Sequence, residues 1–157
     1  MTILASTRAH AIEPRDATYY CAAEAAGGIA YDEQLKRWRS ANFRPDKKFV
    51  LKLKFLSSAK EKMFEWTGPE IVNRFSITVT AAGSNTDTPC RNIQDRGAPV
   101  DVWGNNDWLR CEASLTEYRF NPANNRFLAA YLIGYLSGLE GNDDTPSIWV
   151  GVCTKID

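Results

Sequence analysis

The stretch RFSITVT, residues 74–80, carries the strongest strand signal in this chain of 157 residues. Phe75, Ile77 and Val79 alternate with serine and threonine, and a period of two is typical of a strand with one buried face and one wet face. The stretch KFVLKLKF, residues 48–55, repeats the pattern with apolar residues at positions 49, 51, 53 and 55. Both stretches therefore predict half-buried β-strands.

Five further segments have the composition of strands, namely residues 17–23, 27–31, 108–120, 126–136 and 147–156. The segment NPANN, residues 121–125, predicts a hairpin turn between two of them. Residues 126–136 are apolar on every side and follow that turn, so we interpret them as a buried strand. Gly27 and Gly28 suit a turn or a bulge. Residues 81–99 and 137–146 are rich in Gly, Pro, Asn and Asp and are expected to be surface loops.

One short helix is expected over residues 31–39, YDEQLKRWR. Asp32 would be its N-cap, and Leu35 and Trp38 would lie on one side of it.

These elements predict an all-β fold: an antiparallel meander that closes into a small β-barrel, or a sandwich. Closure would remove exposed edges and make the first and last strands neighbours. We expect one domain over residues 12–157. Residues 1–11 are interpreted as the remnant of a signal peptide, because Ala9-His10-Ala11 has the small-x-small form of a cleavage site. A frayed N-terminus of the domain is the alternative.

Four cysteines are widely spaced and contain no C-x-x-C pair, which favours two disulfides over a zinc site. In a closed meander Cys21 would pair with Cys153, and Cys90 would pair with Cys111. The sequence alone permits three pairings, and four buried free thiols are the alternative. Two disulfides would place the protein in the periplasm or outside the cell.

The chain is charge-balanced, with 19 basic and 19 acidic residues. Ten basic residues nevertheless lie between positions 36 and 62. Arg37, Arg39, Lys52 and Lys54 are the candidates for an anion-binding patch. A solvated strand face is the favoured interpretation, because outward lysines also discourage pairing between sheet edges.

The sequence contains few residues with the usual catalytic chemistry. His10 is the only histidine, and nucleophile, phosphate-loop and dinucleotide motifs are absent from the sequence. We therefore expect no enzyme activity, no cofactor and no metal. GNDDT, residues 141–145, offers Asp143 and Asp144 to Ca²⁺, but it lacks the spaced ligands of a calcium loop and is expected to be a solvated turn.

A carboxylate mechanism is the alternative for catalysis. Trp103 and Trp108 are candidate ligand-binding residues, since acids beside aromatic platforms are what glycoside hydrolysis uses. A turn whose tryptophans shield the core is favoured over a sugar site. The acids in question are Asp101, Asp107, Glu112 and Glu117.

Three segments, residues 27–55, 120–136 and 144–153, resemble small secreted or periplasmic bacterial β-domain proteins. The resemblance covers most of the chain and implies no active site. Periplasmic lysozyme inhibitors are similar in expected architecture alone.

Two functions remain as expectations. The first is a non-enzymatic periplasmic or secreted domain that binds a protein or an anionic envelope component. The alternative is a barrel that binds a glycan or a small molecule, either as a carboxylate-based hydrolase or as a hydrolase inhibitor. Nucleic acid is not expected as a partner. No apolar run approaches the roughly 20 residues of a membrane span.

Overall fold

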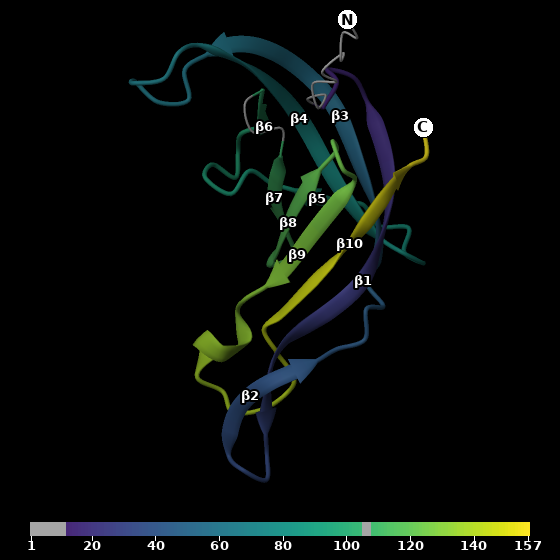
Figure 1. The fold of residues 1–157 in the computed structure, drawn as a ribbon, viewed down its shortest axis with the longest axis vertical. Helices are drawn as coiled ribbons and strands as arrows, with labels where there is room; N and C mark the ends of the chain where they lie inside the picture. The colour runs from purple at the N-terminus through teal and green to yellow at the C-terminus, as the bar shows by residue number, and fades with distance from the viewer. Residues whose placement is uncertain (1–11, 105–107) are drawn as a thin grey trace, which may run out of the picture.

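The computed structural model describes residues 12–104 and 108–157, and the regular structure in this part of the chain is almost entirely β. Figure 1 shows an elongated molecule in which long, curved strands form one sheet. The strands are β1 (Ala17–Asp32), β2 (Arg37–Asn42), β3 (Lys48–Glu61), β4 (Glu70–Ala81), β5 (Thr88–Cys90), β6 (Val100–Trp103), β7 (Leu109–Ala113), β8 (Thr116–Asn121), β9 (Arg126–Tyr131) and β10 (Ser147–Lys155), with one 3-10 helix, η1 (Gly134–Ser137).

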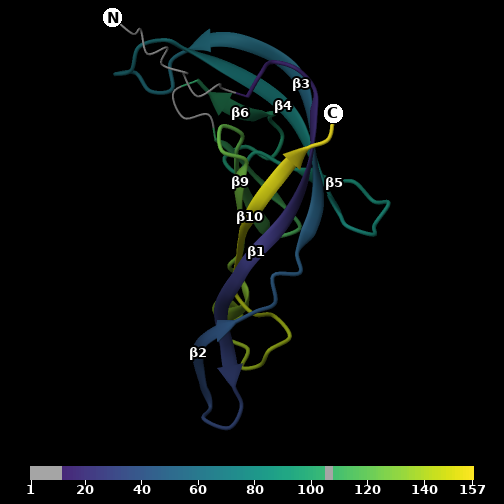
Figure 2. The ribbon, with the colours of Figure 1, turned by 45° about the vertical axis from the view of Figure 1, so that its right-hand side comes forward.

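The sheet is antiparallel and runs in the order β5-β4-β3-β1-β10-β9-β8-β7, with β2 paired to β1 and β6 paired to β4. The predicted all-β antiparallel fold is therefore confirmed. The ladder of strands does not close between β5 and β7, so the predicted closure into a barrel is not confirmed. The hairpin that joins β1 to β2 lies at one end of the molecule, and the β3–β4 hairpin lies at the other (Figures 1 and 2).

The first and last strands are neighbours, as the sequence predicts. Cys21 of β1 is directly opposite Cys153 of β10, and the two form a disulfide with a Cα–Cα distance of 3.9 Å. The second predicted disulfide, Cys90–Cys111, is also present and joins β5 to β7. Both predicted pairings are thus confirmed.

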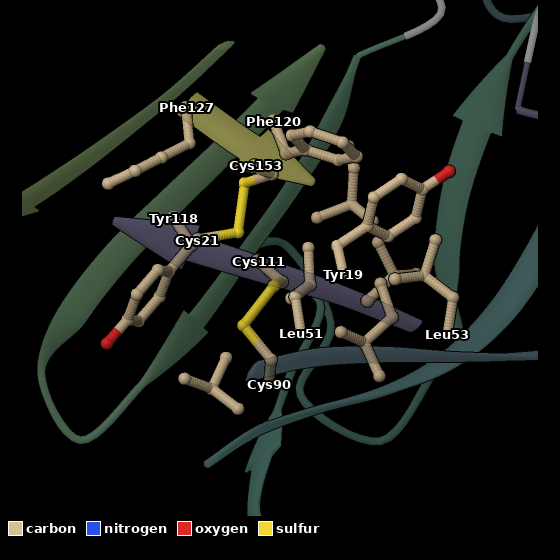
Figure 3. Packing of buried hydrophobic residues seen from close by; sticks show 14 of the residues in the cluster. Tyr19, Cys21, Leu51, Leu53, Cys90, Cys111, Tyr118, Phe120, Phe127 and Cys153 are labelled. Carbon is tan, nitrogen blue, oxygen red and sulfur yellow. A yellow bond between two sulfur atoms is a disulfide. The ribbon is translucent and has the colours of Figure 1, made fainter. Parts of the chain in front are cut away.

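The core contains both disulfides, around which buried aromatic and aliphatic side chains pack (Figure 3). Phe49 is buried, and its ring meets Tyr118 at 5.1 Å and Phe127 at 5.0 Å between centroids. Alternation on β3 and β4 follows the sequence prediction, because the odd positions from 49 to 53 and from 75 to 79 are buried. Lys52 and Lys54 face solvent on the other side.

The helix expected over residues 31–39 is not formed, and a β-hairpin takes its place. Asp32 accepts hydrogen bonds from the backbone N–H groups of Gln34 and Leu35, each at 3.0 Å, as a helix N-cap would. Lys36 then adopts a left-handed φ of 50°, and this reverses the chain into β2. Trp38 thereby packs edge-on against Tyr31 at 5.6 Å, and that contact favours the hairpin.

The prediction of a turn or a bulge at Gly27 and Gly28 is also wrong, because β1 continues through both residues in regular register with β10 and β2. The irregularity in β1 lies between Ala23 and Ala25, where the register with β10 shifts. Gly28 is required for a different reason: a Cβ atom there would lie 2.1 Å from the carbonyl oxygen of Pro146. Close approach of two backbones therefore explains this glycine.

Two segments predicted as single strands are divided in the structure. Residues 108–120 contain a turn at Ser114 and Leu115, whose φ angles of 47° and 62° are both left-handed, so β7 and β8 form a hairpin. The strand predicted over residues 126–136 ends at Tyr131. The predicted hairpin at residues 121–125 is confirmed as the β8–β9 turn.

Residues 1–11, interpreted above as a signal-peptide remnant, lie outside the described residues. Within residues 12–104 and 108–157, no helix has the length and apolar character needed to cross a membrane.

Candidate interaction surface

Residues 132–139, which follow β9 and contain η1, form an exposed apolar segment that we call the apolar loop. The side chain of Leu136 is 81% exposed and that of Leu139 is 75% exposed. The large apolar residues that the loop exposes are Leu132, Ile133, Tyr135, Leu136 and Leu139. Single exposed apolar residues are common on protein surfaces, whereas several in one segment mark an interaction site.

Polar contacts attach the base of the apolar loop to the end of β1. The hydroxyl of Tyr31 donates to Glu140 at 2.6 Å. The backbone N–H of Tyr31 donates to Asn142 at 2.8 Å, and the Asn142 amide donates back to the Tyr31 carbonyl at 2.9 Å. A further hydrogen bond runs from the Tyr131 hydroxyl to Asp144. Because these bonds hold both chain ends of the loop, its apolar side chains are presented in a fixed arrangement.

Aromatic packing attaches the loop to β2. The ring of Trp38 meets Tyr135 edge-on at 5.6 Å, and its other neighbour, Tyr31, lies at the same distance. Gly134 is buried where the loop folds back, and a Cβ atom on it would lie 1.5 Å from the carbonyl oxygen of Asp144. Only glycine fits at this position, since any other side chain would displace the backbone.

These contacts shift the pKa values of the titratable groups beneath the loop. The hydrogen bond to Glu140 and partial burial raise the pKa of Tyr31 to about 12. Donation to Asp144 raises the pKa of Tyr131 as well. The backbone N–H of Leu35, together with the nearby Arg39, lowers the pKa of Asp32. At neutral pH the two phenols are therefore hydrogen-bond donors and Asp32 is a carboxylate.

The four candidate anion-binding residues lie in two separate places. Arg37 and Arg39 are on β2, on the opposite face from Trp38, and Arg39 is 3.2 Å from Asp32. Lys52 and Lys54 are on β3, and Lys52 pairs with Asp87 at 2.9 Å. The register places Lys52 and Arg39 opposite residues 18 and 30 of β1. Twelve residues of strand span about 40 Å, so the structure does not bring the four cations together.

The candidate acids of the hydrolase alternative are paired with arginines where the structure describes them. Asp101 lies 3.2 Å from Arg74, and Glu112 lies 2.9 Å from Arg96. Glu117 binds Arg110 at 2.8 Å as well as Arg119, and these bonds lower its pKa. A general acid in glycoside hydrolysis needs a raised pKa instead. Asp107 lies outside the described residues.

The candidate tryptophans belong to different strands. Trp103 ends β6, opposite Val72 of β4, whereas Trp108 immediately precedes β7 and is 50% exposed. The candidate calcium residue Asp144 accepts the Tyr131 hydroxyl. Over residues 12–104 and 108–157, no cluster of three or more metal-ligating side chains is found.

Reasoning from the sequence missed the apolar loop, because residues 126–136 were interpreted as one buried strand. The signal that could have found it is Gly134, followed by Ser137 and Gly138. A glycine in the middle of an apolar run and a Ser-Gly pair after it favour a break in the strand.

Comparison of the chain with protein-family models, with curated proteins and with solved structures found no match. Its function is therefore inferred from the chemistry of its own surfaces.

Proposed function

We propose that this protein is a non-enzymatic binding domain, periplasmic or secreted, that docks a folded protein partner through the apolar loop. The observation that carries the proposal is that residues 132–139 expose five large apolar side chains while hydrogen bonds hold the loop at its base. A loop that only connected β9 to β10 would need neither exposed apolar side chains nor hydrogen bonds that fix its base.

The energetics favour a protein interface. Complete burial of a leucine side chain contributes about 1.5–3 kcal/mol, so Leu136 and Leu139 together would supply a substantial part of a binding free energy. The contacts of Tyr31 and Trp38 already fix the loop, and a fixed loop loses little conformational entropy when it binds.

The charges beside the loop indicate what the partner's rim would contain. Lys36 and Arg37 are exposed at the β1–β2 turn, where Arg37 directly precedes Trp38 on β2. A partner with an apolar cleft and an acidic rim would complement them. Binding should then weaken as salt screens the rim charges, while the apolar contribution persists.

The disulfides support the proposed compartment. Both bonds link residues far apart in the chain, and all four cysteines are engaged. Such bonds persist in oxidising environments and are rare in the cytosol. The pairing of Asp101, Glu112 and Glu117 with arginines supports a binding role over hydrolysis.

The proposal is tested by placing a photo-crosslinking amino acid at Leu136 in producing cells, with Leu115 as the matched position. Leu115 is also an exposed leucine, but it lies in the β7–β8 turn. We expect position 136 to crosslink one envelope or secreted protein and position 115 not to do so. With that protein purified, Leu136→Ser should weaken binding by about tenfold or more, as loss of roughly 1.4 kcal/mol implies. Leu115→Ser should leave the affinity unchanged.

Crosslinking at both positions to the same set of proteins would contradict the proposal, because it would indicate general stickiness. Crosslinking of position 136 to a second copy of this chain would also contradict it, since the loop would then be a self-association surface.

A further inference from the structure

Three side chains with complementary chemistry, which we call the row, lie at neighbouring ends of β7, β8 and β9 (Figure 1): Trp108, which immediately precedes β7, Asn121 and Arg126. Leu109 is opposite Phe120, and Trp108, one residue before the ladder begins, lines the same hollow as Asn121. Asn121 is in turn opposite Arg126 on β9. Directly opposite residues share a face of the sheet, and the inward face here is occupied by the buried Leu109 and Phe120. The row therefore lies on the outer, solvent-facing side.

A shallow hollow surrounds this row. Its lining includes Trp108, Arg119, Asn121, Asn124, Arg126 and Leu128. Leu128 is opposite Arg119 in the adjacent row and supplies an apolar floor. Neighbouring strands lie about 4.8 Å apart, so the strand positions of residues 108 and 126 are separated by about 10 Å. The hollow thus has the dimensions of one or two sugar rings.

The polar groups around the hollow are mainly hydrogen-bond donors. The side-chain oxygen of Asn121 accepts the Ala123 N–H at 2.9 Å, and that of Asn124 accepts the Arg126 N–H at 3.0 Å. These bonds use the amide oxygens, so the amide NH₂ groups are the donors that remain for a ligand. Together with the guanidinium groups of Arg119 and Arg126, they suit a ligand rich in oxygen acceptors.

The charges around the hollow indicate which of the oxygen-rich ligands it would bind. Glu117 binds Arg119 at 2.6 Å and Arg110 at 2.8 Å, and therefore reduces the positive charge that Arg119 offers. Arg126 is exposed at the row's other end from Trp108. A planar guanidinium is well matched to a carboxylate, which it can bind through two parallel hydrogen bonds.

Trp108 supplies the remaining element of the site. Trp108 is 50% exposed, so it is accessible to an apolar surface, such as the C–H face of a pyranose ring. We propose that the hollow formed by Trp108, Asn121, Arg119 and Arg126 binds an acidic saccharide. The sugar ring would lie against Trp108, and its carboxylate would bind Arg126. The assignment is independent of the partner proposed for the apolar loop, which is formed by other residues.

Calorimetric titration of the purified full chain with a galacturonic acid tetrasaccharide tests the proposal, and the neutral galactose tetrasaccharide of the same linkage is the comparison. We expect saturable binding of the acidic sugar at millimolar concentrations or below. Trp108→Ala should weaken that binding by about tenfold. Arg126→Gln should weaken it by about tenfold as well, because a hydrogen bond to a charged group contributes about 1.5–3 kcal/mol. The Arg126→Gln variant should then bind the acidic sugar no better than the neutral sugar.

Two matched controls come from other parts of the chain. Trp66→Ala removes a tryptophan that is 82% exposed in the β3–β4 turn, and Lys54→Gln removes an exposed cation on β3. Both variants should bind the acidic sugar as the unmodified chain does. Absence of saturable binding at millimolar concentrations would overturn the proposal. So would equal binding of the two sugars by the unmodified chain, or an equal loss in the Trp66 and Trp108 variants.

Discussion

Arg91 and Glu112 exchange two backbone hydrogen bonds, with N···O distances of 2.8 and 2.9 Å, and so form a single β-bridge across the gap between β5 and β7. Each of them directly follows a cysteine of the Cys90–Cys111 disulfide. The two edges of the open ladder are therefore held together by one bridge and one covalent bond. This arrangement covers part of the edges that a sheet would otherwise leave exposed.

We expect the variant Cys90→Ala/Cys111→Ala to lose the bridge between Arg91 and Glu112. The amide protons of these two residues should exchange much faster, because local opening of an edge needs only few contacts to break. The free energy of unfolding should fall by up to about 3 kcal/mol, as the loss of a loop constraint of this length predicts. Hydrogen exchange by NMR and denaturant unfolding measure the two effects.

The control for this variant is Cys21→Ala/Cys153→Ala. It removes the longer loop constraint, about 4–5 kcal/mol, but β1 and β10 stay paired along their length. Slow exchange at Arg91 and Glu112 should be retained in native conditions. Equal loss of protection in both variants would show that the second disulfide has no local role.

Alkaline pH should release the apolar loop from β1. The folded-state pKa values of Tyr31 and Tyr131 are raised, that of Tyr31 to about 12, against an ordinary value of 10.0. The stabilising contributions of both phenols are therefore complete below pH 10, and that of Tyr31 is lost as the pH rises through about 12. The NMR signal of the Trp38 indole, which contacts both Tyr31 and Tyr135, should shift over this range.

In the variant Tyr31→Phe/Tyr131→Phe the part of this shift near pH 12 should be absent, because Tyr31 and Tyr131 can no longer ionise, whereas Tyr135, which also contacts Trp38, is retained. Tyr20→Phe, which removes an exposed phenol on β1, should behave like the unmodified chain. A full shift of the Trp38 signal in the double variant would mean that other groups control the loop.

Gly134→Ala should detach the apolar loop without unfolding the sheet. The added Cβ would lie 1.5 Å from the carbonyl oxygen of Asp144, a distance that only backbone movement can relieve. Limited proteolysis should then cut within residues 132–146, while the melting temperature changes little. Gly141→Ala is the matched control, since nothing lies within 4 Å of a Cβ atom at that position. Similar proteolysis of both variants would contradict the role given to Gly134.

Phe49→Ala should lower the free energy of unfolding by about 3–5 kcal/mol, because it leaves a cavity between Tyr118 and Phe127. Denaturant titration measures this loss. Lys54→Ala, on the solvent face of the same strand, should change the stability by less than about 0.5 kcal/mol. A loss below about 1 kcal/mol for the Phe49 variant would mean that the core can repack around this position.

The side-chain pattern of the sequence determined the strands and the way they face. Phe75, Ile77 and Val79 point inward because a period of two can bury only one face of a strand. The sequence permitted three disulfide pairings, and the expected neighbourhood of the first and last strands favoured the one that the structure contains, with Cys21 bonded to Cys153.

Only the tertiary structure decided that residues 31–39 form a hairpin and that residues 132–139 form an exposed loop. Asp32 makes the same capping bonds in a helix and in a turn, so the packing of Trp38 against Tyr31 and against the distant Tyr135 determines which of the two forms. Leu136 has the same hydrophobicity whether it is buried or exposed. It lies outside because the loop is held on β1 and β2 rather than on the core. Strand register, which depends on contacts between distant residues, likewise separated Arg39 from Lys52 along β1. The pairing of β7, β8 and β9 brought Trp108 and Arg126 to the same hollow.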